Sequence, residues 1–172
     1  MMTGQIAPKG TRLGHVHLHV SDLRRSVAFY RDILGFNLVR YMGDEGAFLS
    51  VDGYHHHIGL NTWGTKGMKN DGVRRPGLYH FALNFPTEEG LAKTIKRVVD
   101  AGWPITGASD HYTHEAVYLD DPDGIGIELA WDRDPSYWGP IFDPTKTVED
   151  LMQLQKRLDV RALIAKYEPE LV

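Results

Sequence analysis

The sequence passes twice through the same order of elements, and this repeat constrains the fold more than any other feature. A strand, a helix that ends at glycine and three short strands are expected within residues 13–63 and again within 76–133. Three pairs of landmarks keep nearly one offset: His15 and His80 are 65 positions apart, Gly35 and Gly102 are 67 apart, and Gly59 and Glu128 are 69 apart. Such an offset indicates two copies of one supersecondary unit.

The first copy opens with a strand over 13–20 in which apolar residues alternate with histidine. Because side chains alternate across a strand, three histidines share one face: His15, His17 and His19. A helix over 22–34 and strands over 36–40, 46–51 and 55–61 are expected to follow.

The second copy opens with a strand over 78–85, where Tyr79 and Phe81 are expected on the packed face and His80 on the other. A helix from Thr87 to Val99 and strands near 105, over 116–120 and over 125–131 complete it. In the last strand Glu128 projects between a glycine and an alanine, which leaves room for a ligand beside the carboxylate.

The repeat predicts an α+β fold in which two βαβββ modules pair as a half-open eight-stranded barrel, with helices outside and a cavity within. The expected domain covers 13–133, with modules at 13–63 and 76–133. A flexible N-terminal arm is expected over 1–12 and a helical extension over 134–172, with one or two helices within 148–166.

Composition narrows the functional classes. The 172 residues have a net charge of −4, so no basic excess indicates nucleic-acid binding, and no apolar run is long enough to cross a membrane. The start lacks the apolar stretch of a signal peptide, so a cytoplasmic location is expected. The chain has no cysteine and nine histidines, so any metal must be bound by imidazole and carboxylate groups.

Four segments carry a resemblance to a known family: Gly14–Leu23, Phe29–Phe36, Tyr79–Leu83 and Asp121–Leu129. Over 13–133 the chain resembles the vicinal oxygen chelate superfamily, which includes glyoxalase I, fosfomycin and bleomycin resistance proteins and extradiol dioxygenases. In that family a divalent metal is held by the first and last strands of each module. The matching positions here are His15, Gly59, His80 and Glu128.

Gly59 departs from the glyoxalase I pattern, in which a fourth protein ligand, usually glutamate, stands at this position. Glycine has no side chain to coordinate a metal. The resemblance therefore implies a metal site of His15, His80 and Glu128, the two-histidine, one-carboxylate set associated with Fe(II) oxygenases; Mn(II) is the other candidate. Three coordination positions would remain, two for a catecholate and one for dioxygen.

The resemblance also implies catalytic residues around the metal. Extradiol dioxygenases carry a histidine three positions before the one matching Gly59, which here is His56, whereas strand alternation places His57 on the face of Gly59. A bulge or strand end would redirect His56, and His57 remains the alternative. The family's active-site tyrosine matches Tyr118, and its loop histidine matches His111 after a short gap.

The resemblance is closest to single-domain extradiol, or catechol 2,3-, dioxygenases. It predicts an Fe(II)-dependent enzyme that cleaves a catechol-type ring with O2, acts on a small aromatic diol and forms a homo-oligomer. One alternative is a glyoxalase-like metal-dependent isomerase or epimerase. The other is a non-catalytic resistance protein that binds an aromatic drug; fosfomycin resistance proteins, however, usually carry threonine where His17 stands.

Overall fold

The computed structural model describes residues 7–73 and 75–168, which form two β-sheets. The first sheet has the order β1 (Val16–His19), β4 (Ile58–Asn61), β3 (Gly46–Ser50) and β2 (Asn37–Met42). The second has the order β5 (His80–Asn84), β8 (Gly126–Asp132), β7 (His114–Asp120), β6 (Gly107–Asp110) and β9 (Lys156–Arg157). In each sheet the first strand of the module lies parallel to its last, so the repeat is confirmed.

The two main helices begin where the sequence supplies a capping side chain. The Asp22 carboxylate accepts a hydrogen bond from the backbone N–H of Arg25 at the start of α1 (Leu23–Ala28), and the Thr87 hydroxyl caps α2 (Glu88–Asp100) in the same way. A π-helical turn, η1 (Phe29–Ile33), continues α1. Gly35, with φ of 85°, follows the end of this first helix.

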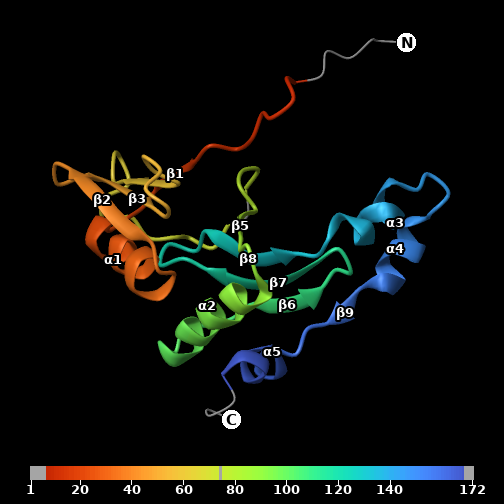
Figure 1. The fold of residues 1–172 in the computed structure, drawn as a ribbon. Coiled ribbons are helices and arrows are strands. Elements are labelled where there is room, and N and C mark those ends of the chain that lie inside the picture. The colour runs from red at the N-terminus through yellow and green to blue at the C-terminus, as the bar shows by residue number, and fades with distance from the viewer. Residues whose placement is uncertain (1–6, 74, 169–172) are drawn as a thin grey trace.

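The core lies between the helices and one face of each sheet. In Figure 1, α1 lies against the first sheet, while α2 and α5 (Val160–Tyr167) lie beneath the second. The largest fully buried side chains come from both layers of both modules and include Tyr30, Leu49, Ile58, Ile95 and Leu129. The opposite sheet faces carry the polar residues of interest. The α+β class with two modules is confirmed, and the sheets remain separate instead of closing into a barrel.

Two details of the expected strands differ from the structure. β4 begins at Ile58, not at residue 55, because the preceding segment turns through Asp52 and Gly53, both with positive φ. Tyr79 was expected on a packed face, but it precedes β5 and is 83% exposed.

The C-terminal extension belongs structurally to the second module. After η2 (Pro135–Trp138) and α3 (Gly139–Phe142), α4 (Val148–Leu154) and α5 provide the expected terminal helices. Between them β9 adds a fifth strand to the second sheet by pairing with β6. α5 packs on α2, where Leu163 is buried and the Lys166 ammonium lies 2.6 Å from the Glu88 carboxylate. Part of the expected flexible arm, residues 1–6, lies outside the described residues.

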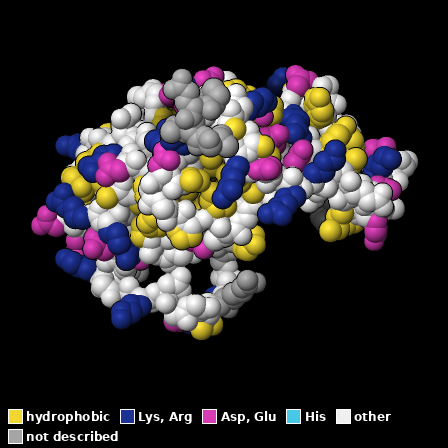
Figure 2. Space-filling view, turned by 90° about the horizontal axis from the view of Figure 1, so that it is seen from below, with side chains coloured by type: hydrophobic (Ala, Val, Ile, Leu, Met, Phe, Trp, Pro, Cys, Tyr) yellow, Lys and Arg dark blue, Asp and Glu magenta, His cyan; other side chains and the backbone are white. Residues whose placement is uncertain are grey.

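Charges of both signs are mixed on the face of the molecule seen in Figure 2. There lysine and arginine side chains are interspersed with aspartate and glutamate. Of the helices in the described parts of the chain, none is both long and apolar enough to span a membrane.

Candidate metal and substrate site

Glu128 lies at the centre of the open face of the second sheet. Its neighbours along β8 on that face are Gly126 and Ala130, and its partners across the sheet are Ala82 on β5 and Tyr118 on β7. The flanking residues along β8 are therefore small, as the sequence indicated. The residue is only 8% exposed because histidine and tyrosine side chains cover it.

Two imidazoles bracket the Glu128 carboxylate. His80 Nε2 lies 2.9 Å from Oε2, and His114 Nε2 lies 3.3 Å from Oε1. The Tyr118 hydroxyl donates to Oε1 over 3.1 Å. These contacts lower the pKa of Glu128, chiefly through the hydrogen bond with His114, and burial opposes the effect only in part. The carboxylate is therefore ionised at neutral pH, the form in which it can bind a cation.

His111 extends this arrangement. Its Nε2 lies 2.8 Å from the Tyr118 hydroxyl, and its ring stacks on that of His114 with centroids 4.6 Å apart. Burial raises the pKa of Tyr118, and the charge of Glu128 raises it further, so the phenol keeps its proton at neutral pH. Burial lowers the pKa of His111, with a further contribution from His114. A neutral imidazole and a neutral phenol thus form a hydrogen-bonded chain that ends at the carboxylate.

The donor set fits a divalent metal. Ligand atoms of His111, His114 and Glu128 all lie within 4.8 Å of one another, and His80 contacts the same carboxylate. Two or more imidazoles with one carboxylate are the ligands of first-row transition metals such as Fe(II), Mn(II) and Zn(II). From the sequence, His114 is a weaker candidate than His111; strand alternation with Tyr118 along β7 could have placed it on this face.

The structure brings two of the three expected metal ligands together. His80 and Glu128 are in contact, whereas His15 precedes β1 in the first sheet and forms no equally compact group with them among the described residues. The His15 ring instead lies 4.3 Å, centroid to centroid, from that of His56. No sheet ladder joins β1 to β5 in the described chain.

His56 and His57 differ in their surroundings. His56 stacks on Phe48 at 4.4 Å, and its pKa is lowered by burial and then by His15. His57 is tied to its own sheet, because Nδ1 lies 3.0 Å from the Ser50 hydroxyl and accepts the Val51 N–H. Since β4 starts only at Ile58, strand alternation does not govern either residue. Of the two residues, His56 is the one whose ring lies against that of His15.

Gly59 leaves space that His17 fills. The two residues are paired across β4 and β1, and a Cβ at Gly59 would lie 2.9–3.0 Å from atoms of the His17 ring. A side chain at Gly59 therefore requires His17 to move. Because paired residues share a face, the Gly59 position lies on the same sheet face as His15 and His17.

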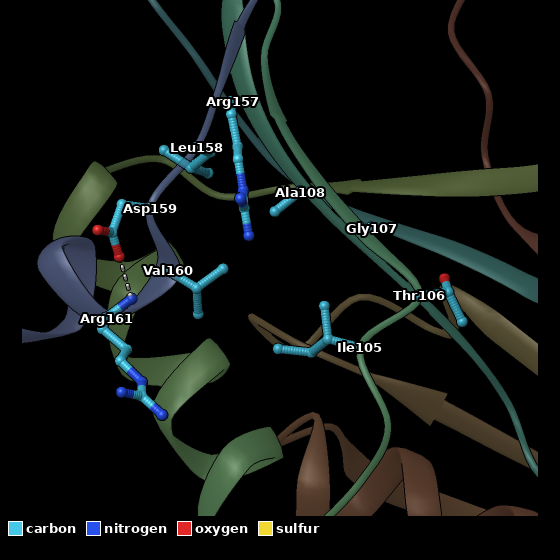
Figure 3. Close-up of a pocket in the computed structure, with 9 residues that line it drawn as sticks. All are labelled: Ile105, Thr106, Gly107, Ala108, Arg157, Leu158, Asp159, Val160 and Arg161. Carbon is cyan, nitrogen blue, oxygen red and sulfur yellow. Dashed lines mark hydrogen bonds between the residues drawn. The ribbon is translucent and has the colours of Figure 1, made fainter.

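Two cavities lie near the second sheet. One of about 480 Å³ adjoins the candidate site and is lined in part by Tyr79, His80, Gly107 and Tyr118. The other, about 790 Å³, lies between β6 and the β9–α5 segment (Figure 3) and is lined by Ile105–Ala108 and Arg157–Arg161. It offers no histidine, and Asp159 caps α5 by accepting from the Arg161 N–H. Of these two cavities, only the smaller has a histidine in its lining.

Three relatives show the range of activities among similar chains. A catechol-2,3-dioxygenase of Bacillus subtilis is 43% identical over 99 residues, which are 57% of this chain and 35% of that protein. Biphenyl-2,3-diol 1,2-dioxygenase 3 of Rhodococcus globerulus is 31% identical, covering 71% of this chain and 64% of that protein. A probable lactoylglutathione lyase of Synechocystis is 33% identical over 67% of this chain and 91% of its own length. This chain thus spans about a third of the length of the first dioxygenase and just under two thirds of the length of the second.

Solved structures show the same fold. A glyoxalase/dioxygenase from Nostoc punctiforme matches 78% of this chain and all of its own, with a TM-score of 0.60 and 19% identity. A glyoxylase/bleomycin resistance protein/dioxygenase domain from Frankia matches 72% of this chain and 98% of its own, with a TM-score of 0.59 and 27% identity. The family model of this superfamily matches residues 12–129. The chain belongs to the glyoxalase/bleomycin resistance protein/dioxygenase superfamily.

Proposed function

We propose that this chain is an Fe(II)-dependent extradiol dioxygenase that cleaves a catechol-type ring beside its two hydroxyls. The observation that carries the proposal is the ionised Glu128 carboxylate between two imidazoles, with the protonated Tyr118 hydroxyl 3.1 Å away. A metal ligand set therefore adjoins a hydrogen-bond donor suited to a substrate oxygen. Two similar proteins named as dioxygenases of aromatic diols support the same reading.

We propose His80 and Glu128 as metal ligands, with His15 as the third. The contact between His80 and Glu128 supports the first two, and the family resemblance supports His15. His15 belongs to the first sheet. It can join His80 and Glu128 only if a first sheet, from the same chain or from a second copy, faces the second sheet. Mn(II) would suit the same donors.

Held by His15, His80 and Glu128, an Fe(II) ion would supply the Lewis-acid and redox chemistry that a reaction between a diol and O2 requires. The chain's own residues handle orientation and protons. Tyr118 can donate a hydrogen bond to a diol oxygen, and His111 can hold the phenol in place through the 2.8 Å contact. His56, with a pKa lowered by burial, can accept a proton at neutral pH.

The main alternative is a glyoxalase-like isomerase, which the similarity to a probable lactoylglutathione lyase favours. Gly59 argues against an isomerase, because it stands at the position where glyoxalase I usually has a glutamate as its fourth metal ligand. Oxygen uptake separates the two. After anaerobic loading with Fe(II), the protein should consume O2 with at least one of a panel of catechols. Isomerisation of a methylglyoxal–thiol adduct with no oxygen uptake from any catechol would reject the dioxygenase.

Tyr118→Phe should lower kcat for ring cleavage by about 100-fold while leaving metal content unchanged. The substitution removes only the hydroxyl that contacts Glu128 and His111. Steady-state oxygen uptake and metal analysis of the same sample provide the test. Tyr112→Phe, one loop away, is the matched control and should retain activity. Wild-type kcat in Tyr118→Phe would show that the hydroxyl takes no part in the reaction.

A further inference from the structure

The two modules meet partly through an apolar contact. The rings of Phe29 on η1 and Trp103 after α2 lie 4.6 Å apart at an interplanar angle of 46°. Arg97 of α2 donates to the backbone oxygens of Ile33 and Leu34 over 3.2 and 3.3 Å. Apolar contacts are non-directional, so the ring pair alone does not fix the angle between the sheets. The two Arg97 hydrogen bonds are directional, but they constrain only the contact between α2 and the end of the first helix.

A second contact between the modules is built from directional bonds to a single turn. The turn joins β7 to β8 and contains Asp121 and Asp123. The Asp123 carboxylate accepts from the Ser21 N–H over 3.0 Å, from the Ser21 hydroxyl over 2.5 Å and from the Arg25 guanidinium over 2.5 Å. Burial raises the pKa of Asp123, but the Ser21 and Arg25 donors outweigh it and leave the pKa lowered, so the carboxylate is ionised at neutral pH.

Asp121 connects the turn's own shape to the other module. One carboxylate oxygen accepts from the backbone N–H groups of Asp123 and Ile125, over 2.8 and 2.9 Å, and the other accepts from the Tyr30 hydroxyl over 3.1 Å. Asp121 is 4% exposed and Tyr30 is fully buried. A buried hydrogen bond of this kind is costly to leave unmade, so it resists a change in the relative position of its partners.

These bonds join the chain just beyond one candidate ligand strand to the start of another. Ser21 follows β1, whose preceding residue is His15, and Glu128 follows Asp123 by five positions on β8. Asn70 of the inter-module connection also donates to the Asp123 backbone oxygen over 2.9 Å. The β7–β8 turn therefore contacts three segments: the chain just after β1, helix α1 and the connection between the two modules.

We propose that Asp121 and Asp123 are positioning residues: with Ser21, Arg25 and Tyr30 they form a clasp that sets the orientation of the first sheet relative to the Glu128 strand. The expected effect on catalysis rests on the proposed function, whereas the effect on the orientation of the sheets does not. A loosened clasp removes only polar contacts and leaves the apolar core shared by the two modules in place, but it widens the range of angles between the sheets. Metal ligands and substrate groups contributed by the first sheet then lose their fixed position.

The absence of cysteine allows a direct test by distance measurement. Spin labels on Asp44→Cys in the exposed β2–β3 turn and Ala101→Cys at the exposed end of α2 report the separation of the modules, in protein diluted with unlabelled wild-type chain. Double electron–electron resonance should give one narrow distance distribution. Adding Asp123→Ala with Ser21→Ala should broaden it. Tyr30→Phe, which removes one hydroxyl, should broaden it in the same direction.

Val98→Ala is the control for a general loss of stability, because Val98 is fully buried in α2 and makes no clasp contact. It should lower the melting temperature and keep the narrow distribution. In the Fe(II)-loaded protein the clasp variants should lose kcat by about tenfold or more, and Val98→Ala should not. A narrow, unshifted distribution in both clasp variants would overturn the proposal.

The two proposals fail separately in this experiment. Broadening in the clasp variants of a protein that cleaves no catechol would reject the dioxygenase and retain the clasp. Ring cleavage by the wild type with an unchanged distribution in the clasp variants would reject only the clasp.

Discussion

Glu128→Ala should lose the bound metal and ring cleavage together. The carboxylate contacts both His80 and His114, so its removal takes away the anionic partner that these imidazoles share. A fall in metal affinity on the order of 100-fold or more is expected, since even supporting residues around a metal change affinity 10–100-fold. Metal content after dialysis and titration with Fe(II) under anaerobic conditions measure the effect.

Glu115→Gln provides the matched control. Glu115 is a second buried glutamate on the neighbouring strand β7, but it faces away from the site and pairs with Arg133 at 2.7 Å. Its substitution should affect folding stability without changing metal affinity. Full metal occupancy in Glu128→Ala, or equal metal loss in both variants, would contradict the assignment of Glu128 as a ligand.

The histidine variants should separate two possible ligand sets that share Glu128. If the ligands are His15, His80 and Glu128, His15→Ala should lower metal affinity by on the order of 100-fold and His114→Ala by about tenfold, as expected for a residue that only supports the carboxylate. His17→Ala, on the same sheet face as His15, is the control and should retain the metal. Metal analysis of these variants under identical dialysis gives the comparison.

The opposite ranking of the His15→Ala and His114→Ala variants in metal affinity would point to a different set of ligands. Metal loss in His114→Ala with retention in His15→Ala would assign the site to the compact group within the second module, where ligand atoms already lie within 4.8 Å. Refolding His15→Ala together with Glu128→Ala tests whether the first sheet comes from a second copy. Recovery of activity in the mixture is expected only when one intact site can form between two chains.

The repeat was visible in the sequence because its signals are local. Alternating strands, the side-chain caps Asp22 and Thr87 and the glycines after each helix depend on backbone geometry within a few residues. The boundary of β4 was misplaced because two positive-φ residues before it end the extended conformation, which histidine-rich alternation does not reveal. β9 was missed because its two residues pair only through a long-range contact.

Part of the candidate site was also predictable from the sequence. His80, Glu128, Tyr118 and His111 come together as expected because neighbouring strands of one sheet bring them into contact. His114 is only a weaker candidate from the sequence, although it lies on the same strand face as Tyr118. The relation of His15 to Glu128 depends on how two sheets face each other, a property carried by contacts such as Tyr30–Asp121 that are 91 residues apart in sequence.

Cleavage of a catechol under ¹⁸O2 tests the central proposal most directly. The Fe(II)-loaded protein is given a catechol and labelled dioxygen, and the product is analysed by mass spectrometry. The proposal predicts a ring-opened product cleaved beside the diol that carries both labelled oxygen atoms, with no such product from Glu128→Ala. An unlabelled rearranged product, or a labelled product with the ring intact, would contradict it.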